Sequence, residues 1–193
     1  MHTNWVAKAV FSAASKNKKQ DGLQINLLGC NVDDAAAVRL ATTLAGTDIR
    51  ALNLTFNHVG DIGVRAIAKG LAYTRELREL NLASNLITDH GCMALAEVLV
   101  DPASRLTFLN LSGNMVGNTG ADMLGVSLEA NPSLVEICLD SNFIGLQGKD
   151  ALADGMAKNR SGAVEFISLA GNVRSGILRK LTTGDVQRVV WNT

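Results

Sequence analysis

Residues 109–114 read Leu-Asn-Leu-Ser-Gly-Asn, and this hexamer decides the fold because versions of it recur through the chain. The shared pattern is an aliphatic residue, a variable residue, a leucine, two variable residues and a small polar residue. Its copies follow one another at intervals of 27–30 residues. Such a fixed period indicates a repeat architecture in which each unit stacks on the next. The six copies span residues 25–30, 52–57, 80–85, 109–114, 137–142 and 167–172.

The hydrophobic period changes inside each unit. Leu109 and Leu111 alternate with polar residues, and this period of two predicts a short strand. Beyond the polar residue, aliphatic pairs four residues apart predict a helix. These pairs are Leu40 and Leu44, Ile67 and Leu71, Leu95 and Leu99, Leu124 and Leu128, and Leu152 and Met156.

Two further positions recur at the predicted helix starts. A short polar residue stands four positions after the end of the hexamer, where it is expected to cap the helix N-terminus. A glycine stands two positions later, which predicts a place too crowded for a larger side chain. The polar residues are Asp34, Asp61, Asp89 and Asn118, and the glycines are Gly63, Gly91, Gly120 and Gly148.

The pattern resembles the leucine-rich repeat family, and its period with a full helix per unit is similar to the ribonuclease-inhibitor-like subclass. The resemblance covers residues 22–172 as six repeats. It implies an α/β fold, a right-handed solenoid or horseshoe with a parallel concave sheet and convex helices. The last residue of each hexamer is then expected to bond to backbone groups inside the stack. Cys30 fills that slot in the first repeat, and we interpret it as structural.

Both ends of the array need covers, because terminal repeats would otherwise expose core leucines. Residues 1–21 contain an apolar helical stripe that begins at Trp5, and we predict an N-terminal capping helix. The repeat pattern fails after Asn172, where Arg174 takes an aliphatic position, so residues 173–193 are predicted to form a C-terminal cap. The alternative is that the chain is an excerpt of a longer array, with Trp191 facing a missing neighbour.

Composition and charge limit the functional classes. The chain has 193 residues and zero formal net charge, but residues 21–172 hold 17 acids and 10 bases, a net charge of −7 that disfavours nucleic-acid binding. No apolar stretch has the length of a membrane span, and no signal peptide is evident. Three widely spaced cysteines in such a chain fit a reducing compartment. We therefore predict no nucleic-acid partner, no membrane association and a cytoplasmic location.

Catalytic and cofactor motifs are not recognisable. The histidines, at positions 2, 58 and 90, have no Ser, Cys or Asp at a catalytic spacing. Gly148-Lys149 is similar to part of a phosphate loop, but Phe143 stands where the first glycine is required and Asp150 follows the lysine. We predict that the chain is not an enzyme and binds no cofactor or metal.

The outward-facing strand positions remain as the candidate site. Alternation turns every second strand residue outward, and stacking aligns these residues into columns across the sheet. The second half of the array places Phe108 and Phe166 around Glu136, and exposed aromatic residues beside acids are typical of protein-binding hot spots. The first half is expected to be bland, and the asparagine column also fits ordinary repeat consensus. The predicted partner-binding residues are Glu79, Phe108, Asn110, Glu136, Cys138, Asp140, Phe166 and Ser168.

The leading functional hypothesis is a non-enzymatic module that binds a protein partner with a basic surface through the concave face. A second hypothesis is actin-filament end capping, because residues 141–145 are similar to a stretch of the tropomodulin-like cappers. A third is a Ran GTPase-activating-type regulator, although this chain is shorter than those arrays and has a basic tail. Delivery by a microbe into a host cytosol is also compatible with the sequence. The oligomeric state is not predicted.

Overall fold

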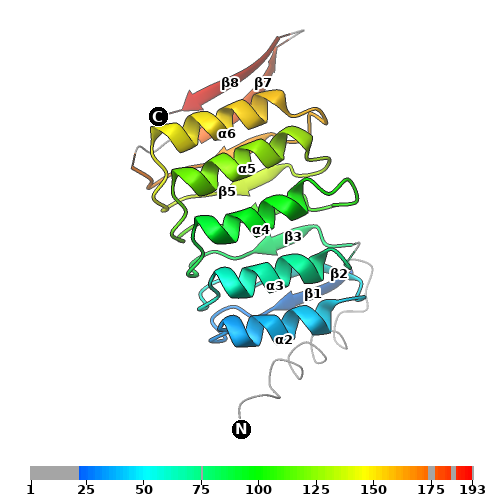
Figure 1. The fold of residues 1–193 in the computed structure, drawn as a ribbon. Coiled ribbons are helices and arrows are strands. Elements are labelled where there is room, and N and C mark those ends of the chain that lie inside the picture. The colour runs from blue at the N-terminus through cyan, green and yellow to red at the C-terminus, as the bar shows by residue number, and fades with distance from the viewer. Residues whose placement is uncertain (1–21, 75, 174–176, 184–185, 193) are drawn as a thin grey trace.

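The computed structural model describes residues 22–74, 76–173, 177–183 and 186–192, with side chains described up to residue 173. Within these residues, strands and helices alternate along the chain (Figure 1). The predicted N-terminal capping helix at residues 1–21 lies outside them. The repeat strands are β1 (Leu23–Asn26), β2 (Ile49–Asn53), β3 (Glu79–Asn81), β4 (Phe108–Asn110), β5 (Glu136–Cys138) and β6 (Phe166–Ser168). The helices are α2 (Asp34–Leu44), α3 (Asp61–Leu71), α4 (Asp89–Leu99), α5 (Asn118–Ala130) and α6 (Leu146–Lys158).

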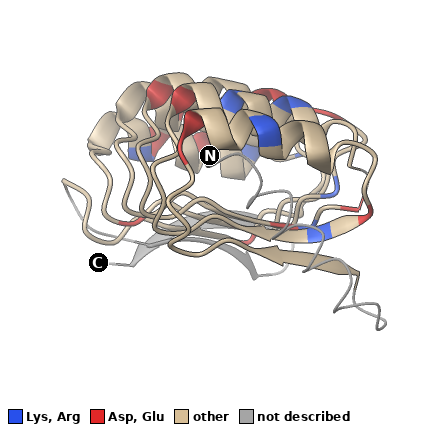
Figure 2. Ribbon diagram, turned by 90° about the horizontal axis from the view of Figure 1, so that it is seen from below, with Lys and Arg blue, Asp and Glu red and all other residues tan. Residues whose placement is uncertain are grey.

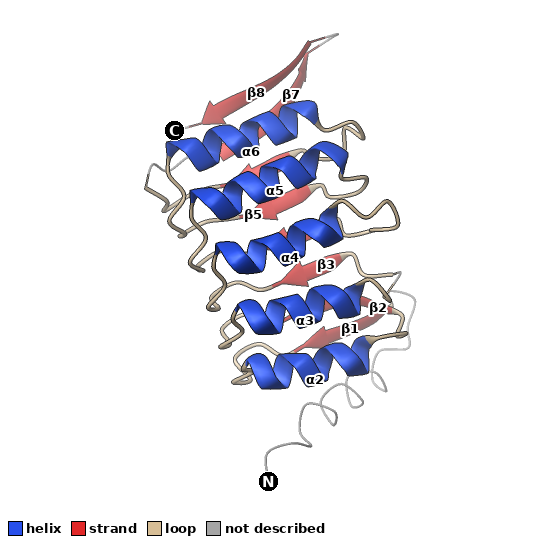
Figure 3. Ribbon diagram, viewed as in Figure 1, coloured by secondary structure: helices blue, strands red, loops and turns tan. Residues whose placement is uncertain are grey.

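The strands form one sheet in sequence order, and each of the five helices in the described residues connects two neighbouring parallel strands. Pairing from β1 to β6 is parallel, and strand–helix–strand crossovers between parallel strands are almost always right-handed. All five helices lie on the same side of the sheet (Figure 3). The predicted leucine-rich repeat solenoid, with its concave sheet and convex helices, is confirmed.

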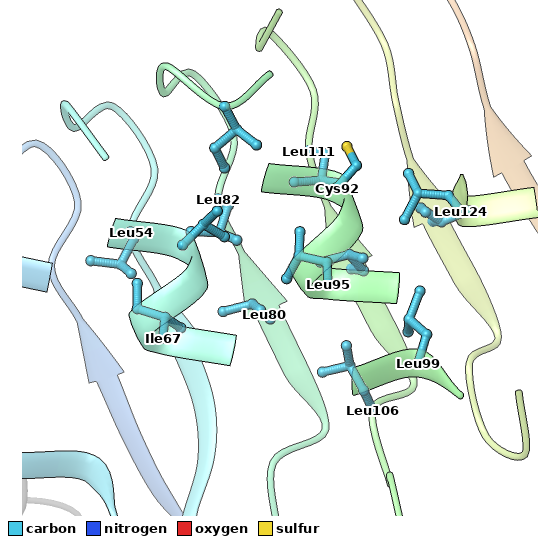
Figure 4. Packing of buried hydrophobic residues seen from close by; sticks show 14 of the residues in the cluster. Leu54, Ile67, Leu80, Leu82, Cys92, Leu95, Leu99, Leu106, Leu111 and Leu124 are labelled. Carbon is cyan, nitrogen blue, oxygen red and sulfur yellow. The ribbon is translucent and has the colours of Figure 1, made fainter. Parts of the chain in front are cut away.

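The core is a continuous layer between the sheet and the helices. The first five repeats each contribute the two aliphatic residues of the hexamer and the apolar stripe of the helix, and the sixth contributes Ile167 and Leu169. Leu80 of β3 and Leu95 of α4, for example, are essentially inaccessible to water. Figure 4 shows strand and helix side chains of neighbouring repeats pointing into this shared layer. No repeat encloses its own leucines, so adjacent repeats are required to bury them.

The asparagine that ends each hexamer from the second to the sixth joins neighbouring repeats, as predicted. The Oδ1 of Asn85 accepts from the buried backbone nitrogen of Val59 at 3.0 Å. Its Nδ2 donates to Leu54 O of the preceding repeat at 2.9 Å and to Leu82 O of its own repeat at 3.0 Å. Asn57, Asn114, Asn142 and Asn172 repeat this arrangement. Polar groups that the turns would otherwise bury unpaired are thereby satisfied.

The expected helix caps act on a different helix from the one that their position suggests. Asp34 is the first residue of α2, but its Oδ1 accepts from the backbone nitrogens of Gly60 and Gly63, at the start of α3, at 2.7 and 2.9 Å. Asp61 accepts from the backbone nitrogen of Thr88, the residue before α4, at 2.9 Å and from the Thr88 hydroxyl at 2.6 Å. These side chains therefore cap the helix of the following repeat. The prediction of a cap is confirmed, and its assignment to the adjacent helix start is wrong.

The recurring glycines leave room for these capping side chains and for neighbouring aliphatic side chains. A Cβ atom on Gly63 would lie 2.6 Å from Oδ1 of Asp34, and one on Gly91 would lie 2.6 Å from Oδ1 of Asp61. Such distances are well inside van der Waals contact, so larger residues would displace the cap. The predicted crowding is confirmed.

The sixth repeat ends differently from the others. Residues 177–183 (β7) and 186–192 (β8) form an antiparallel pair that extends the sheet beyond β6. In the described residues no helix follows β6, and Leu146 stands where the earlier repeats carry the cap for the next helix. The series of caps thus ends where the series of helices ends. The role of residues 173–193 as a cap stays a prediction.

The concave face as the candidate functional site

The outward positions of the strands line up in columns, as the alternation predicts. In the first column Glu79, Phe108, Glu136 and Phe166 are direct neighbours on β3, β4, β5 and β6. Neighbouring parallel strands lie about 4.8 Å apart, so carboxylates and phenyl rings alternate along this row at that spacing. Glu79 is exposed and the other three are half-buried. The structure therefore brings together the core of the predicted site.

Two of the predicted residues, Asp140 and Ser168, are bonded to each other. The Ser168 hydroxyl donates to Oδ1 of Asp140, and the backbone nitrogen of Ala170 donates to the same oxygen at 2.6 Å. Ser168 is only 9% exposed. Together they hold the turn after β6 to the turn after β5, which leaves Ser168 little contact area for a partner.

Cys138 is held as a neutral thiol beside Glu136. Its Sγ donates to Oε1 of Glu136 at 3.3 Å. Burial, and then the hydrogen bond and negative charge of Glu136, raise the pKa of this thiol to about 12. The reactive form of cysteine is the thiolate, so Cys138 is not an activated nucleophile.

Asparagine side chains fill the second column on β1 to β4. The Oδ1 atoms of Asn26, Asn53, Asn81 and Asn110 each accept from a backbone nitrogen two residues further on, at 2.9–3.1 Å. These local bonds fix the amide groups. Among the described residues their Nδ2 atoms have no hydrogen-bond partner, so four donors remain available on the concave face.

A hollow of about 220 Å³ lies over β1 to β4. Its floor includes Ala51, the smallest residue of the first column, and larger side chains of the neighbouring strands form its walls. Sequence reasoning missed this hollow, because the first half of the array was expected to be bland. The signal available was one small residue in a column of large ones. The residues that line it are Gln24, Ile25, Asn26, Ala51, Leu52, Asn53, Glu79, Asn81 and Phe108.

A larger hollow, of about 600 Å³, lies on the convex side between α3 and α4. Gly70 packs closely on the Ala41 backbone between α2 and α3. Val98 takes the corresponding position in α4 and lines the hollow. The hydroxyls of Thr74 and Ser133 in its wall donate to nearby backbone carbonyls. It is remote from the predicted site.

Charge is distributed differently on the two sides of the molecule. Lysine, arginine, aspartate and glutamate are mixed over the helices (Figure 2). In the outward columns of β1 to β6 the charged residues are the three acids Glu79, Glu136 and Asp140, without a lysine or arginine. No described ion pair involves these acids. The concave face thus carries unpaired negative charge.

Metal and membrane sites are not evident in the described part of the chain. No group of three or more His, Cys, Asp or Glu side chains in it could hold a metal ion. None of the described helices has the length and apolar character needed to cross a bilayer.

Comparison with known proteins identifies the repeat. The profile of the family described as "Leucine Rich repeat" matches residues 47–68, 75–96 and 105–125, in register with the strand and helix starts seen in the structure. The chain contains leucine-rich repeats at these residues. The human NACHT, LRR and PYD domains-containing protein 12 is 29% identical over 128 residues, which are 66% of this leucine-rich repeat chain and 9% of that protein's length.

A similar solved structure has the same fold. It is described as leiomodin-1 actin-binding site 2, and it superposes with a TM-score of 0.63 and 20% sequence identity. The match covers 84% of this leucine-rich repeat chain and 94% of the other chain. At this level of identity the likeness shows a shared architecture.

Proposed function

We propose that this leucine-rich repeat protein is a non-enzymatic interaction module that binds a protein partner along its concave face. The observation that carries the proposal is the row Glu79, Phe108, Glu136 and Phe166, four neighbours on successive strands. Aromatic side chains contribute large contact area at interfaces, and the carboxylates beside them add charge specificity. Repeat scaffolds present such columns as extended binding surfaces. The repeat family supports the module, and the concave row supports this location for its site.

The partner proposed for this face carries a basic surface. The outward columns of β1 to β6 offer three acids and no lysine or arginine, so a basic surface would be electrostatically complementary to them. Nucleic acid and membranes are not the proposed partners, because both have anionic surfaces that the acidic array would repel. The proposed location is the cytoplasm, supported by three unpaired cysteines. The repeat length of 27–30 residues supports the ribonuclease-inhibitor-like subclass.

Actin binding is a second candidate function. It is supported by the structural likeness to a leiomodin segment described as an actin-binding site. The segment from Ser141 to Gly145, at the turn after β5, is the part of this chain that is similar to the tropomodulin-like cappers. Phe143, in this turn, is 65% exposed and lies outside the concave columns. The two candidates therefore place the partner on different surfaces.

A paired affinity capture from cytosolic extract tests these proposals. The wild-type chain is compared with Phe108→Ala/Phe166→Ala on the concave face and with Phe56→Ala/Phe143→Ala on the turns. Phe56 and Phe143 are 67% and 65% exposed. The second variant therefore also removes two phenylalanine side chains, but from a different surface of the molecule. We expect the concave variant alone to lose the partner while circular dichroism shows both variants folded. Equal capture by all three proteins would contradict the concave site, and loss of actin with the turn variant would favour the second candidate.

A further inference from the structure

The hollow over β1 to β4 combines hydrogen-bond donors, a carboxylate and an aromatic ring in one place. We propose that it receives a lysine or arginine side chain from an extended segment of the partner, whose main-chain carbonyls bind the asparagine amides beside it. This inference rests on the concave face being the partner-binding surface. It moves the centre of that surface from the second half of the array to the first.

The asparagine amides provide the donors. The Oδ1 atoms of Asn26, Asn53 and Asn81 accept from the backbone nitrogens of Leu28, Thr55 and Ala83 at 3.1, 3.0 and 3.1 Å. In each amide the carbonyl end is therefore occupied, and Nδ2 has no partner among the described residues. The strand spacing sets these donors about 4.8 Å apart. A polypeptide main chain carries the carbonyl acceptors that such a row of donors requires.

The cationic side chain is favoured by Glu79 and Phe108. These residues are direct neighbours on β3 and β4, and both line the hollow. A cation within about 6 Å of a phenyl centre is attracted by the ring, and a carboxylate beside it adds an ion pair. No lysine or arginine lines the hollow, and no described ion pair neutralises Glu79. The positive charge therefore has to come from the ligand.

The size of the hollow favours a side chain over a whole small molecule. Its volume of about 220 Å³ is below the range of about 300–1,000 Å³ typical of small-molecule sites. Gln24, Ala51 and Glu79 occupy the same column on β1, β2 and β3. The small side chain of Ala51 therefore leaves a space between the larger side chains of Gln24 and Glu79.

Nuclear magnetic resonance provides the test, since asparagine side-chain amides give their own signals. The chain is titrated to about 10 mM with acetyl-Gly-Gly-Arg-Gly-Gly-amide and, separately, with the same peptide carrying citrulline, which is neutral and close to arginine in shape. We expect the Nδ2 signals of Asn26, Asn53 and Asn81 to move with the arginine peptide. Asn110 has the same side chain in the same column but lies outside the hollow, so its signal should stay in place.

The expected affinities separate the contribution of the arginine side chain's charge from that of its shape. Citrulline should weaken binding about fivefold, because it removes both the ion pair and the interaction with the ring. Glu79→Gln should weaken binding of the arginine peptide about threefold. The matched variant Glu97→Gln, at an exposed position on α4 outside the concave columns, should bind as the wild type does.

Several results would overturn the inference. These are equal binding of the arginine and citrulline peptides, movement of the Asn110 signal without the other three, and unmoved signals at the highest peptide concentration. Movement of the three signals with neutral maltohexaose but not with the arginine peptide would assign the hollow to a saccharide instead. If the peptide fails while Phe108→Ala/Phe166→Ala still abolishes partner capture, the inference is wrong and the proposed function stands. If capture is equal for all variants, the proposed function itself is wrong.

Discussion

Replacing Asn85 with alanine removes one set of hydrogen bonds between repeats at the middle of the array. Asn85 is 5% exposed, and its side chain bonds to groups of two successive repeats. Its Oδ1 is the acceptor for the buried backbone nitrogen of Val59. The carbonyls of Leu54 and Leu82 also accept from the asparagines of the neighbouring hexamers, so each keeps one bond after the substitution.

The cost can be estimated from these bonds. Val59 N–H is left buried with no described acceptor, which costs about 1–3 kcal/mol. Loss of the shared bonds to Leu54 and Leu82 adds about 1 kcal/mol. We therefore expect Asn85→Ala to lower the free energy of unfolding by about 2–4 kcal/mol, a large part of the 5–15 kcal/mol typical of folded domains.

Asn81→Ala is the matched control, because it removes the same side chain four residues away on the same repeat. Asn81 makes one local bond, to the backbone nitrogen of Ala83, and its Nδ2 has no described partner. Its loss should cost less than about 1 kcal/mol. Urea unfolding followed by circular dichroism measures the unfolding free energy of both variants. The slope of that free energy against urea concentration should match the wild-type slope, which checks two-state behaviour. Equal costs, or a cost below about 1 kcal/mol for Asn85→Ala, would refute the reasoning.

Three further substitutions or treatments probe other features. Gly155→Ala should destabilise the chain by at least about 2 kcal/mol, because the new Cβ would lie 2.6 Å from the carbonyl carbon of Gly125 on α5. Urea unfolding measures this loss, and an unchanged midpoint would contradict the close packing of α5 and α6. Asp61→Ala should cost about 1 kcal/mol by the same assay through loss of the cap on α4, whereas Asp154→Ala at an exposed position should cost less than about 0.5 kcal/mol. Cys138, with its pKa raised to about 12, should remain unmodified by iodoacetamide at about pH 8 in the folded chain, as mass spectrometry would show; rapid modification there would contradict the thiol's assigned environment.

The repeat architecture could be predicted from the sequence because its determinants are local. The alternation of Leu109 and Leu111 and the polar residue at Asn114 recur in every unit with few changes, and stacking is the one way such units bury their leucines. The crowding at Gly63 was visible for the same reason, since the glycine recurs at a fixed place.

Contacts between repeats could be predicted only in part. The position of Asp61 shows that it stands at a helix start, but its partner depends on the offset between stacked helices. In the structure that offset brings its carboxylate to Thr88, one repeat further on. The bond between Ser168 and Asp140 has the same origin, because it joins the end of β6 to the turn after β5, 28 residues earlier in the chain.

The hollow on the concave face depends on register across several strands. Ala51 is unremarkable within its own repeat, and its effect appears only when Gln24 and Glu79 are placed on either side of it. The predicted row of Phe108, Glu136 and Phe166 was found because its members are large or charged. The hollow could not be predicted in this way, because no large or charged residue in the sequence indicates an empty space.

Site-specific photo-crosslinking tests the concave binding face most directly. A benzoylphenylalanine is placed at Asn110, on the concave face, or at Val126, which is 62% exposed on α5. Both proteins are irradiated in cytosolic extract, and the crosslinked products are compared by mass spectrometry. The account predicts a protein partner crosslinked from Asn110 and not from Val126. A partner crosslinked from Val126 alone would contradict it.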